Sequence, residues 1–303
     1  MITWEEAIEN YSMYLTLERS LSVHSVAAYL NDIRKLARFC MQDTPPVLPT
    51  ELTYPVLNLH LSALRDAGIS ARTQARNVSS LKSFFKYLVY DEKLRVNPAA
   101  NLDAPKSPKM LPSVLTVDEI EAMLRAIDLD KSEGQRDRAI IETLYSCGLR
   151  VSELCNLKLS NINFRMGFVK VEGKGNKERL VPIGTKAKEE IRGYMKTSRE
   201  RLLKGRGEDI VFLNRFGRKL SRVAVFNIIK QATLKAGINK VISPHTLRHS
   251  FASHLVNGGA NIRAVQDMLG HKSILTTEIY THLDNAFLRD TLVNYHPRSR
   301  KKG

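Results

Sequence analysis

The sequence predicts a mainly α-helical protein in which an N-terminal helical bundle precedes an α+β unit with a small three-stranded antiparallel sheet. Apolar residues recur at helical spacing through most of the chain, and alternating strand-like patterns are confined to short segments after residue 160. The stretch 97–112 holds four prolines and no helical periodicity, which is typical of an extended linker. We therefore divide the chain into a helical domain at 1–96, a linker at 97–112 and a second domain at 113–303.

The first domain is predicted to contain four helices. Thr3 followed by Glu6 is a capping pattern at the start of the first helix, and the third is expected near 53–66. The apolar residues that share a face in the other helices are Ala7, Tyr11, Tyr14 and Leu15, then Val26, Leu30, Ile33 and Ala37, then Val78, Leu81, Phe85 and Leu88. Aromatic side chains at 84, 85 and 87 could stack on nucleic-acid bases, but their helical spacing favours a core position, which is our interpretation.

The second domain begins with helices and then changes period. Thr116 with Glu119 is another capping pattern, and helices are expected from there to about residue 157 and again from about 221 to the end. Strands are expected at 167–173, 178–183 and 210–213. The first two are joined by a glycine-rich turn with Lys174 at its tip.

Charge is the first indication of function. The chain has 303 residues with a formal net charge of +16, 43% hydrophobic and 26% charged residues, a composition typical of a globular protein. Residues 1–107 hold 12 basic and 11 acidic side chains, whereas the remainder holds 35 and 20. This excess favours a polyanionic partner, of which nucleic acid is the commonest, over the alternative of a merely solvated basic surface.

Cysteine usage and the N-terminus point to the cytoplasm. Cys40, Cys147 and Cys155 are scattered and lack CxxC spacing, so neither a disulfide framework nor a zinc site is indicated. Cys147 and Cys155 lie in an apolar helical stretch and are interpreted as core residues. No run approaches the roughly 20 apolar residues of a membrane span, and glutamates among the first ten residues do not fit a signal peptide.

One helix start has the composition of an anion site. Ser243 and Pro244 form an N-cap and first helical position, and His245 and Arg248, three residues apart, are expected on one face of the first turn. Free backbone N–H groups, an imidazole and a guanidinium together suit a phosphate. His245 and His249 could be read as a metal pair, but the glutamate and third ligand of a hydrolytic zinc helix are not in the pattern.

Four further residues each have an ordinary structural explanation when taken alone, but their order in the chain indicates a function. Arg150 follows a glycine at a helix break, Lys174 lies on the hairpin tip, His271 follows a glycine, and Tyr280 comes nine residues later. In chain order they give Arg, Lys, His-x-x-Arg, Gly-His and Tyr, all in the basic part of the chain.

This order resembles the tyrosine recombinases, or phage-integrase family, over nearly the whole chain. The phrases GLRVSEL (148–154), GKGNKERLVPI (173–183), HTLRHSFASHL (245–255) and MLGHKSILTTEIYTH (268–282), with the earlier NPA…PK strap, are most similar to the bacterial Xer recombinases of the XerC and XerD type. Carried over to matching positions, the resemblance implies the active-site residues Arg150, Lys174, His245, Arg248, His271 and Tyr280.

The resemblance also implies a fold and a reaction. The N-terminal bundle would be a SAM-like core-binding domain, and the two domains would form a C-shaped clamp around duplex DNA. Tyr280 would be the nucleophile that forms a 3′-phosphotyrosyl bond. Arg150 and Arg248 would hold the non-bridging phosphate oxygens. Because the phosphotyrosine conserves the energy of the broken bond, neither ATP nor a metal cofactor would be needed.

The remaining implied residues move protons or contact the phosphate. Lys174 would be the general acid for the leaving 5′-oxygen, His245 would help accept the tyrosine proton, and His271 would hydrogen-bond the scissile phosphate.

The implied partners are a specific duplex DNA site, a second Xer-type recombinase in a heterotetramer or a self-tetramer on two sites, and an FtsK-type DNA translocase. The implied role is resolution of chromosome dimers before cell division. An integrase or invertase of a mobile element has the same chemistry and stays open. So does a non-catalytic DNA-binding protein that kept the fold, although no expected active-site residue is missing.

The end of the chain is predicted to be a helix capped by Asp284. Its apolar face would contain Phe287, Leu288, Leu292 and Tyr295. For an arbitrary terminal helix this face would pack on its own domain, whereas the resemblance implies docking on a neighbouring recombinase.

Overall fold

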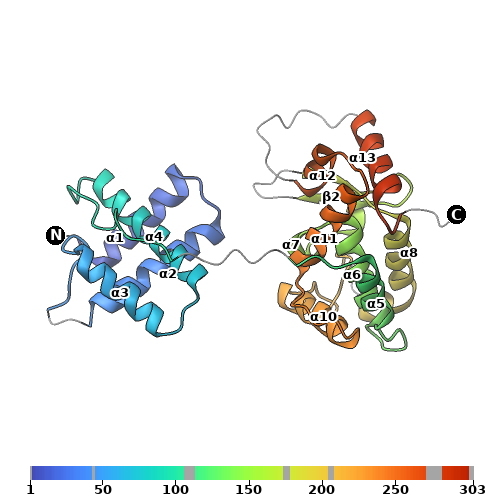
Figure 1. Cartoon of the computed structure of the whole chain (residues 1–303), viewed down its shortest axis with the longest axis horizontal. Coiled ribbons are helices and arrows are strands. Elements are labelled where there is room, and N and C mark those ends of the chain that lie inside the picture. The colour runs from blue at the N-terminus through green and yellow to red at the C-terminus, as the bar shows by residue number, and fades with distance from the viewer. Residues whose placement is uncertain are drawn as a thin grey trace. The chain divides into compact units, whose positions relative to one another are not determined.

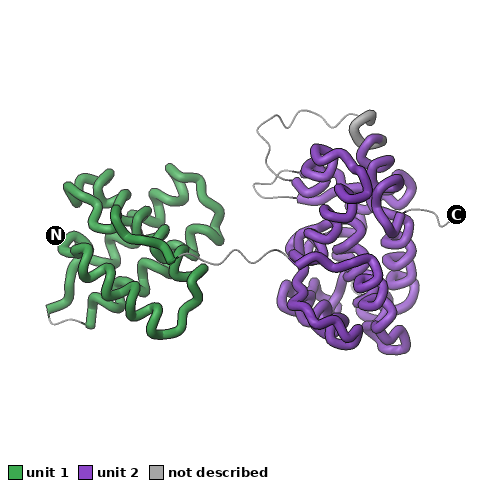
Figure 2. The backbone as a smooth tube through the Cα atoms, in the orientation of Figure 1, with its two compact units in different colours: residues 1–110 green, residues 111–303 purple. Residues whose placement is uncertain are grey.

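The chain folds into two compact units, residues 1–110 and 111–303, which are described separately (Figure 2). The computed structural model describes residues 2–42, 45–105, 113–172, 178–203, 208–270 and 282–299. Helices dominate both units, and the single small sheet among the described residues lies in the second, so the predicted mainly α fold class is confirmed (Figure 1). No described helix combines the length and apolar character needed to cross a membrane.

The first unit is a bundle of helices. Its elements are α1 (Trp4–Met13), a π-helical extension (Tyr14–Glu18), α2 (Val23–Cys40), α3 (Tyr54–Asp66) and α4 (Ala71–Tyr90). Helix α1 is capped by Thr3, whose hydroxyl accepts a hydrogen bond from the N–H of Glu6 at 3.3 Å. The four helices predicted from periodicity are therefore present.

The core of the first unit is aromatic. Phe84 and Phe85 are fully buried, and the ring of Phe84 stacks on Trp4 and meets Tyr11 edge-on, at centroid distances of 6.1 and 5.2 Å. Tyr87 is 6% exposed. The interpretation of these aromatic residues as core rather than base-stacking groups is confirmed, and their burial stabilises the contact of α1 with α4.

The second unit combines helices with the sheet. Its helices are α5 (Val117–Arg125), α6 (Gly134–Cys147), α7 (Val151–Cys155), a 3-10 turn (Leu159–Asn161), α8 (Thr185–Tyr194), a π-helical segment (Met195–Arg199), α9 (Glu200–Leu203), α10 (Arg222–Lys235), α11 (Pro244–Asn257), α12 (Ile262–Leu269) and α13 (His282–Tyr295). Helix α6 is buried on nearly every side and packs against α8 and α11. Thr116 caps α5 in the predicted capping box with Glu119. Cys147 and Cys155 are core residues, as expected.

The sheet has the order β1 (Ile162–Asn163), β2 (Phe168–Glu172) and β3 (Glu178–Pro182), all antiparallel. Val169 and Val171 of β2 are buried, and opposite them in the register lie Val181 and Arg179 of β3. An arginine therefore occupies an inward position in a strand that otherwise follows the alternation of a half-buried sheet.

The third strand was predicted in the wrong place. Residues 210–213 make only isolated bridges, Ile210 with Lys158 and Leu213 with Lys219, and β1 is the third strand instead. Val211, Phe212 and Leu213 are fully buried, so core packing rather than ladder pairing explains their apolar run. Strand β1 has only two residues, too few for a periodic pattern.

The C-terminal segment packs on its own unit. Leu288 and Leu292 of α13 are 3% and 1% exposed within the core of this unit, whereas Phe287 is 54% exposed. The implied docking of this face on a neighbour is therefore not the arrangement of the single chain. Asp284 lies inside α13 rather than at its N-cap.

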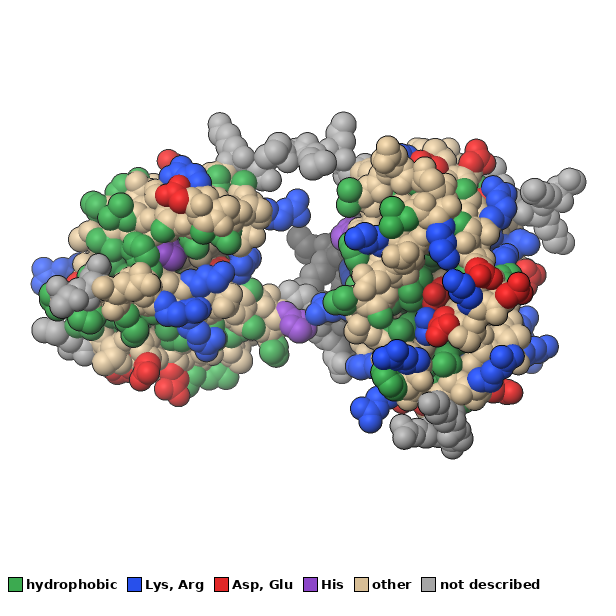
Figure 3. Space-filling view, turned by 90° about the horizontal axis from the view of Figure 1, so that it is seen from below, with side chains coloured by type: hydrophobic (Ala, Val, Ile, Leu, Met, Phe, Trp, Pro, Cys, Tyr) green, Lys and Arg blue, Asp and Glu red, His purple; other side chains and the backbone are tan. Residues whose placement is uncertain are grey.

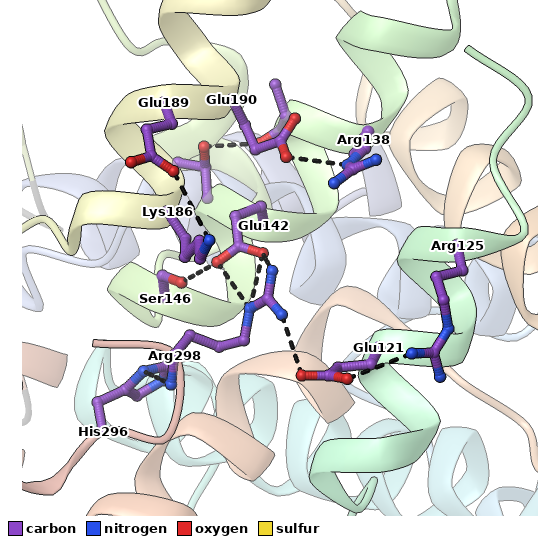
Figure 4. A network of polar contacts seen from close by, with 12 residues as sticks. Glu121, Arg125, Arg138, Glu142, Ser146, Lys186, Glu189, Glu190, His296 and Arg298 are labelled. Atoms are coloured by element: carbon purple, nitrogen blue, oxygen red, sulfur yellow. Dashed lines mark hydrogen bonds and ion pairs between the residues drawn. The ribbon is translucent and has the colours of Figure 1, made fainter. Parts of the chain in front are cut away.

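Three residues after the end of α13, Arg298 belongs to a network of polar contacts (Figure 4). Its guanidinium donates to the fully buried carboxylate of Glu142, at 2.8 Å from Nη2 and 3.1 Å from Nε, and to Glu121 at 3.3 Å. Ser146 donates to the same Glu142 carboxylate at 2.6 Å. The fully buried His296 lies beside Arg298, with its ring 4.8 Å from that of Tyr145. The end of the chain is thus held by a desolvated ion pair as well as by apolar contacts.

His296 makes the stability of the second unit depend on pH. Burial, with smaller effects of the charges of His254 and Arg298, lowers the pKa of His296 from 6.5 to about 3. Below pH 6.5 the unfolded chain binds a proton that the folded chain does not, so stability is lost as the pH falls. Between pH 7.5 and 5 the resulting loss in the free energy of unfolding is about 2 kcal/mol.

We expect His296→Gln to abolish this difference between pH 7.5 and 5, measured as the free energy of urea unfolding at both pH values. His24→Gln, at an exposed histidine of the first unit, is the control. An unchanged pH dependence in His296→Gln would contradict the assignment.

Candidate active site

Arg150 is placed by a sharp break between two helices. Gly148 ends α6 in the left-handed conformation at φ +58°, and a Cβ there would lie 2.5 Å from the ring of Phe251. Both constraints require glycine. The chain then turns, and Arg150 becomes the extended N-cap residue of α7 with a side chain 40% exposed.

Glu153 is a buried carboxylate that binds two arginines. Its Oε1 accepts from Nη1 of Arg150 and Nη1 of Arg179, both at 2.7 Å. Its Oε2 accepts from the backbone N–H of Arg150 at 2.7 Å and from Nη2 of Arg179 at 2.9 Å. Burial by itself would raise the pKa of Glu153, but the hydrogen bonds and charge of Arg179, together with the bonds from Arg150, lower it below the ordinary value. The carboxylate is therefore ionised at neutral pH and acts as a charged cap on α7.

Arg248 joins the same cluster from α11. Its side chain is 7% exposed, and Nη1 lies 3.9 Å from Oε2 of Glu153. Nη1 also donates to the carbonyl of Gly148 at 2.7 Å. Burial, followed by the charge of Arg150, lowers the pKa of Arg248 to about 10, which still leaves the guanidinium charged at neutral pH.

The end of α12 supplies the remaining acceptors. The carbonyls of Met268, Leu269 and Gly270 accept in turn from Nε of Arg179 at 3.0 Å, Nη2 of Arg248, and Nη2 of Arg150 at 3.2 Å. The last carbonyls of a helix have no partner within it and carry partial negative charge, so guanidinium groups are suitable caps. Successive carbonyls of one helix end thus bind three different arginines.

His245 lies at the solvent edge of α11. Ser243 accepts from the N–H of Thr246 at 3.3 Å, and Pro244 is the first helical residue, which confirms the predicted cap. His245 is exposed, whereas Arg248 one turn later is buried. The imidazole is therefore accessible to a ligand that approaches the start of this helix.

The cluster has the chemistry of an oxyanion site. Three guanidinium groups surround one carboxylate, so the charges leave a local excess of two positive charges. Arg150, the most exposed of the three arginines, has a planar fork suited to bidentate contacts with phosphate oxygens.

Comparison with known proteins identifies the family. The Phage integrase family model matches residues 113–286, and the model of the phage integrase N-terminal SAM-like domain matches residues 8–92. Tyrosine recombinase XerD of Staphylococcus aureus strain N315 is 42% identical over 295 residues, covering 97% of this chain and 100% of the relative. The chain belongs to the phage integrase family of tyrosine recombinases. Within that family it is most similar to the Xer type, as the sequence phrases predicted.

Other relatives agree with this assignment. Tyrosine recombinase XerD of Staphylococcus epidermidis is 41% identical over 292 residues, covering 96% and 99% of the two chains. Among solved structures, the XerH recombinase bound to a palindromic difH substrate has a TM-score of 0.70 at 22% identity, covering 96% of this chain and 84% of that one. A lambda integrase tetramer bound to a Holliday junction has a TM-score of 0.69 at 22% identity, covering 93% and 80%. These two structures support the fold of this recombinase.

Three of the six predicted active-site residues fall within the described part of this recombinase. Arg150 and Arg248 meet at Glu153, and His245 lies on the first turn of the helix that carries Arg248. Lys174, His271 and Tyr280 lie outside the described residues.

Sequence reasoning missed Glu153 and Arg179. Glu153 stands three residues after Arg150, a spacing that allows a side chain to reach back to the start of its own helix, and this signal was available. Arg179 shares a strand face with Val181, so an arginine at an inward position was a second signal. Their bond joins residues 26 positions apart in the chain, which no local pattern reveals.

The cluster predicts a large effect of removing the Glu153 charge. Glu153→Gln keeps the shape of the side chain but leaves the buried Arg179 and Arg248 without an anion, and loss of one buried partner costs about 3–5 kcal/mol. We expect a decrease of that size in the free energy of urea unfolding of the second unit. In the control, Glu189→Gln, an exposed pair with Lys186 at 3.8 Å is lost, and a change below about 1 kcal/mol is expected. Equal effects of the two substitutions would show that Glu153 is not the central counter-charge.

Proposed function

We propose that this recombinase cuts and rejoins duplex DNA at a specific site through a 3′-phosphotyrosyl intermediate on Tyr280. In this proposal Arg150, Lys174, His245 and Arg248 act with His271 on the scissile phosphate. The convergence of Arg150 and Arg248 on one buried carboxylate, Glu153, carries the proposal, because it holds two guanidinium groups at one place, and such groups are suited to bind phosphate oxygens. Identity of 42% to a XerD recombinase over its full length gives independent support.

The two arginines would stabilise the transition state electrostatically. Attack on a phosphodiester develops negative charge on the non-bridging oxygens of a pentavalent phosphorane, and fixed positive charges stabilise it more than the ground state. Arg248 is held by backbone carbonyls and needs little reorganisation, whereas the exposed edge of Arg150 is open to the phosphate. A neutral amide in either place could not supply this stabilisation.

The other residues would handle the nucleophile and the leaving group. The Tyr280 hydroxyl loses its proton, with His245 as a helper, and its oxygen forms a bond to phosphorus while the bond to the 5′-oxygen breaks. Lys174 gives a proton to that 5′-oxygen, and His271 donates a hydrogen bond to the phosphate. Attack by a 5′-hydroxyl on the phosphotyrosine then reverses the steps on a new strand. The energy of the original bond is kept, so ATP and a divalent ion are not required.

The likeness to XerD recombinases supports a proposal for the cellular role. We propose that this recombinase resolves chromosome dimers at a dif-like site in the cytoplasm, with a second Xer-type recombinase or further copies of itself in a tetramer, under an FtsK-type translocase. The helical domain at 1–96 and the catalytic domain at 113–303, joined by the linker at 97–112, would together clamp the duplex. In Figure 3 lysine and arginine side chains are exposed on both units, interspersed with Asp and Glu on the second. The excess of 35 basic over 20 acidic side chains after residue 107 supports contact of the second unit with a polyanion.

Tyr280→Phe tests the nucleophile. The substitution removes one hydroxyl, so we expect no covalent protein–DNA complex on a nicked substrate carrying the target site, with binding to that DNA changed less than about threefold. Denaturing gel electrophoresis measures the complex, and Tyr90→Phe, at an exposed tyrosine of the first unit, is the control. A covalent complex formed by Tyr280→Phe would refute the assignment.

Sequencing of the DNA trapped by the wild-type protein also separates the biological alternatives. A single chromosomal site is expected for dimer resolution. If the trapped DNA comes from the ends of a mobile element, an integrase or invertase is favoured instead. If no DNA is covalently trapped, the result favours a non-catalytic DNA-binding protein.

Lys174→Ala tests the general acid. We expect cleavage of the nicked substrate to slow by about 100-fold or more, within the range of acid catalysis. A substrate whose leaving group is a 5′-thiol needs no protonation, and on it the variant should cleave within about threefold of the wild type. If the thiol substrate is cleaved as poorly as the normal one, Lys174 is not the acid.

A further inference from the structure

The cluster contains an arginine to which the reaction above gives no role. Arg179 points inward from β3 and is 7% exposed. Its Nη1 and Nη2 form a parallel pair of bonds with the Glu153 carboxylate, at 2.7 and 2.9 Å, and Nε donates to the carbonyl of Met268 at 3.0 Å. All three guanidinium nitrogens are therefore engaged within the protein, which argues against direct contact with DNA.

Arg179 controls the acceptor on which Arg150 depends. Oε1 of Glu153 accepts from Arg179 and Arg150 together, and Oε2 accepts from the side chain of Arg179 and the backbone of Arg150. A planar bidentate pair fixes the plane of the carboxylate as well as its position. Since the Arg150 side chain is 40% exposed and long, the direction of its guanidinium is set largely by this buried anchor.

Arg179 also supports the turn after α12. Gly270 has φ +61°, and a Cβ there would lie 3.0 Å from Cδ and 3.1 Å from Nε of Arg179, so the arginine packs directly against the glycine. The Gly270 carbonyl accepts from Nη2 of Arg150 at 3.2 Å. His271 follows Gly270 in the chain, and Arg179 itself stands two residues after the segment 173–177 that contains Lys174. One side chain thus joins β3, the start of α7 and the end of α12.

We propose that Arg179 is a positioning residue for strand cleavage, which presents Glu153 to Arg150 and fixes the Gly270 turn, without contact with the DNA. The inference rests on the proposed function and deepens it. Lysine cannot replace arginine in this role, because a single ammonium forms neither the parallel pair of bonds nor the third bond to Met268. A displacement of a catalytic group by about 1 Å costs on the order of 100-fold in rate.

A double-mutant cycle between Arg179→Lys and Arg150→Lys tests this proposal. The measurement is the single-turnover rate of covalent complex formation on saturating nicked substrate, with the full-length protein and with folding checked by calorimetry. We expect Arg179→Lys to bind DNA within about threefold of the wild type and to cleave about 10- to 100-fold more slowly. In the Arg150→Lys background the same change should slow cleavage less than about threefold, because its effect passes through Arg150.

A neutral substrate shows whether slow cleavage by Arg179→Lys comes from a misplaced Arg150 or from a smaller fraction of folded protein. A methylphosphonate at the scissile position replaces one charged oxygen by a methyl group and so reduces the need for a well-placed guanidinium. We expect the loss of cleavage rate in Arg179→Lys to be smaller on this substrate, whereas a smaller active fraction would lower the rates on the normal and the methylphosphonate substrates equally.

Arg199→Lys is the matched control. Arg199 is a buried arginine of the same unit whose donors go to the carbonyls of residues 208, 210 and 211, and its substitution should lower stability without changing the rate of the folded enzyme.

The outcomes distinguish this inference from the proposed function. A wild-type protein without covalent complex would overturn the function itself. Two results would overturn the positioning role if the wild type cleaves and Arg150→Lys is slow. One is an Arg179→Lys variant that cleaves at the wild-type rate. The other is a loss of rate from Arg179→Lys that is the same in the wild-type and Arg150→Lys proteins. If Arg179→Lys does not fold, Arg179→Gln, which keeps one donor for the carboxylate, is put through the same cycle. Failure of both to fold while Arg199→Lys folds would assign Arg179 to folding alone and overturn the proposal.

Discussion

The site depends on one buried negative charge. Without the Glu153 carboxylate, Arg150, Arg179 and Arg248 would be like charges in a partly desolvated place, and each would repel the others. With it, four hydrogen bonds to two arginines offset the cost of taking the carboxylate out of water. The anion does not cancel the cluster, however. An excess of positive charge remains, and this excess makes the site attractive to a phosphodiester while the fold around it stays stable.

The acceptors at the end of α12 define the state of the site before a phosphate binds. Arg150 and Arg248 donate to the carbonyls of Gly270 and Leu269, so one nitrogen of each guanidinium is held by this helix end. A phosphate oxygen carries more charge than a carbonyl and is the stronger acceptor for a guanidinium. In the proposed reaction, replacement of the Gly270 carbonyl by a phosphate oxygen at Arg150 would need little movement, because the bond from Arg150 to Gly270 is exposed and long at 3.2 Å. The carbonyls therefore hold the arginines in place and would compete only weakly with a phosphate, so the proposed site would be preorganised for its substrate.

Local chemistry explains which parts could be predicted from the sequence. The caps at Thr116 and Ser243 and the core aromatics at 84, 85 and 87 depend on neighbours within one or two helical turns, and each was correctly predicted. The strand at 210–213 was not, because an apolar run reports burial and not hydrogen-bond partners. The resemblance supplied Arg150 and Arg248 as separate residues. Glu153 connects them, and it lies three positions from Arg150 but nearly one hundred from Arg248. Arg179, which binds the same carboxylate, is also distant in the chain, so only the tertiary fold brings these atoms together.

The C-terminal segment shows how cis packing and an exchange between subunits can be compatible. Leu288 and Leu292 are buried in the chain's own unit, and Arg298 pairs with the buried Glu142. A helix that left this place for the same surface of an identical neighbour would lose these contacts and regain equivalent ones, so the net enthalpy would change little. The activation barrier to this exchange, by contrast with the net enthalpy, would be large. Withdrawal of Arg298 leaves Glu142 as an uncompensated buried charge until another guanidinium arrives, which costs about 3–5 kcal/mol. Such a barrier would keep an isolated chain in the cis arrangement and would make any exchange depend on a neighbour already being in place.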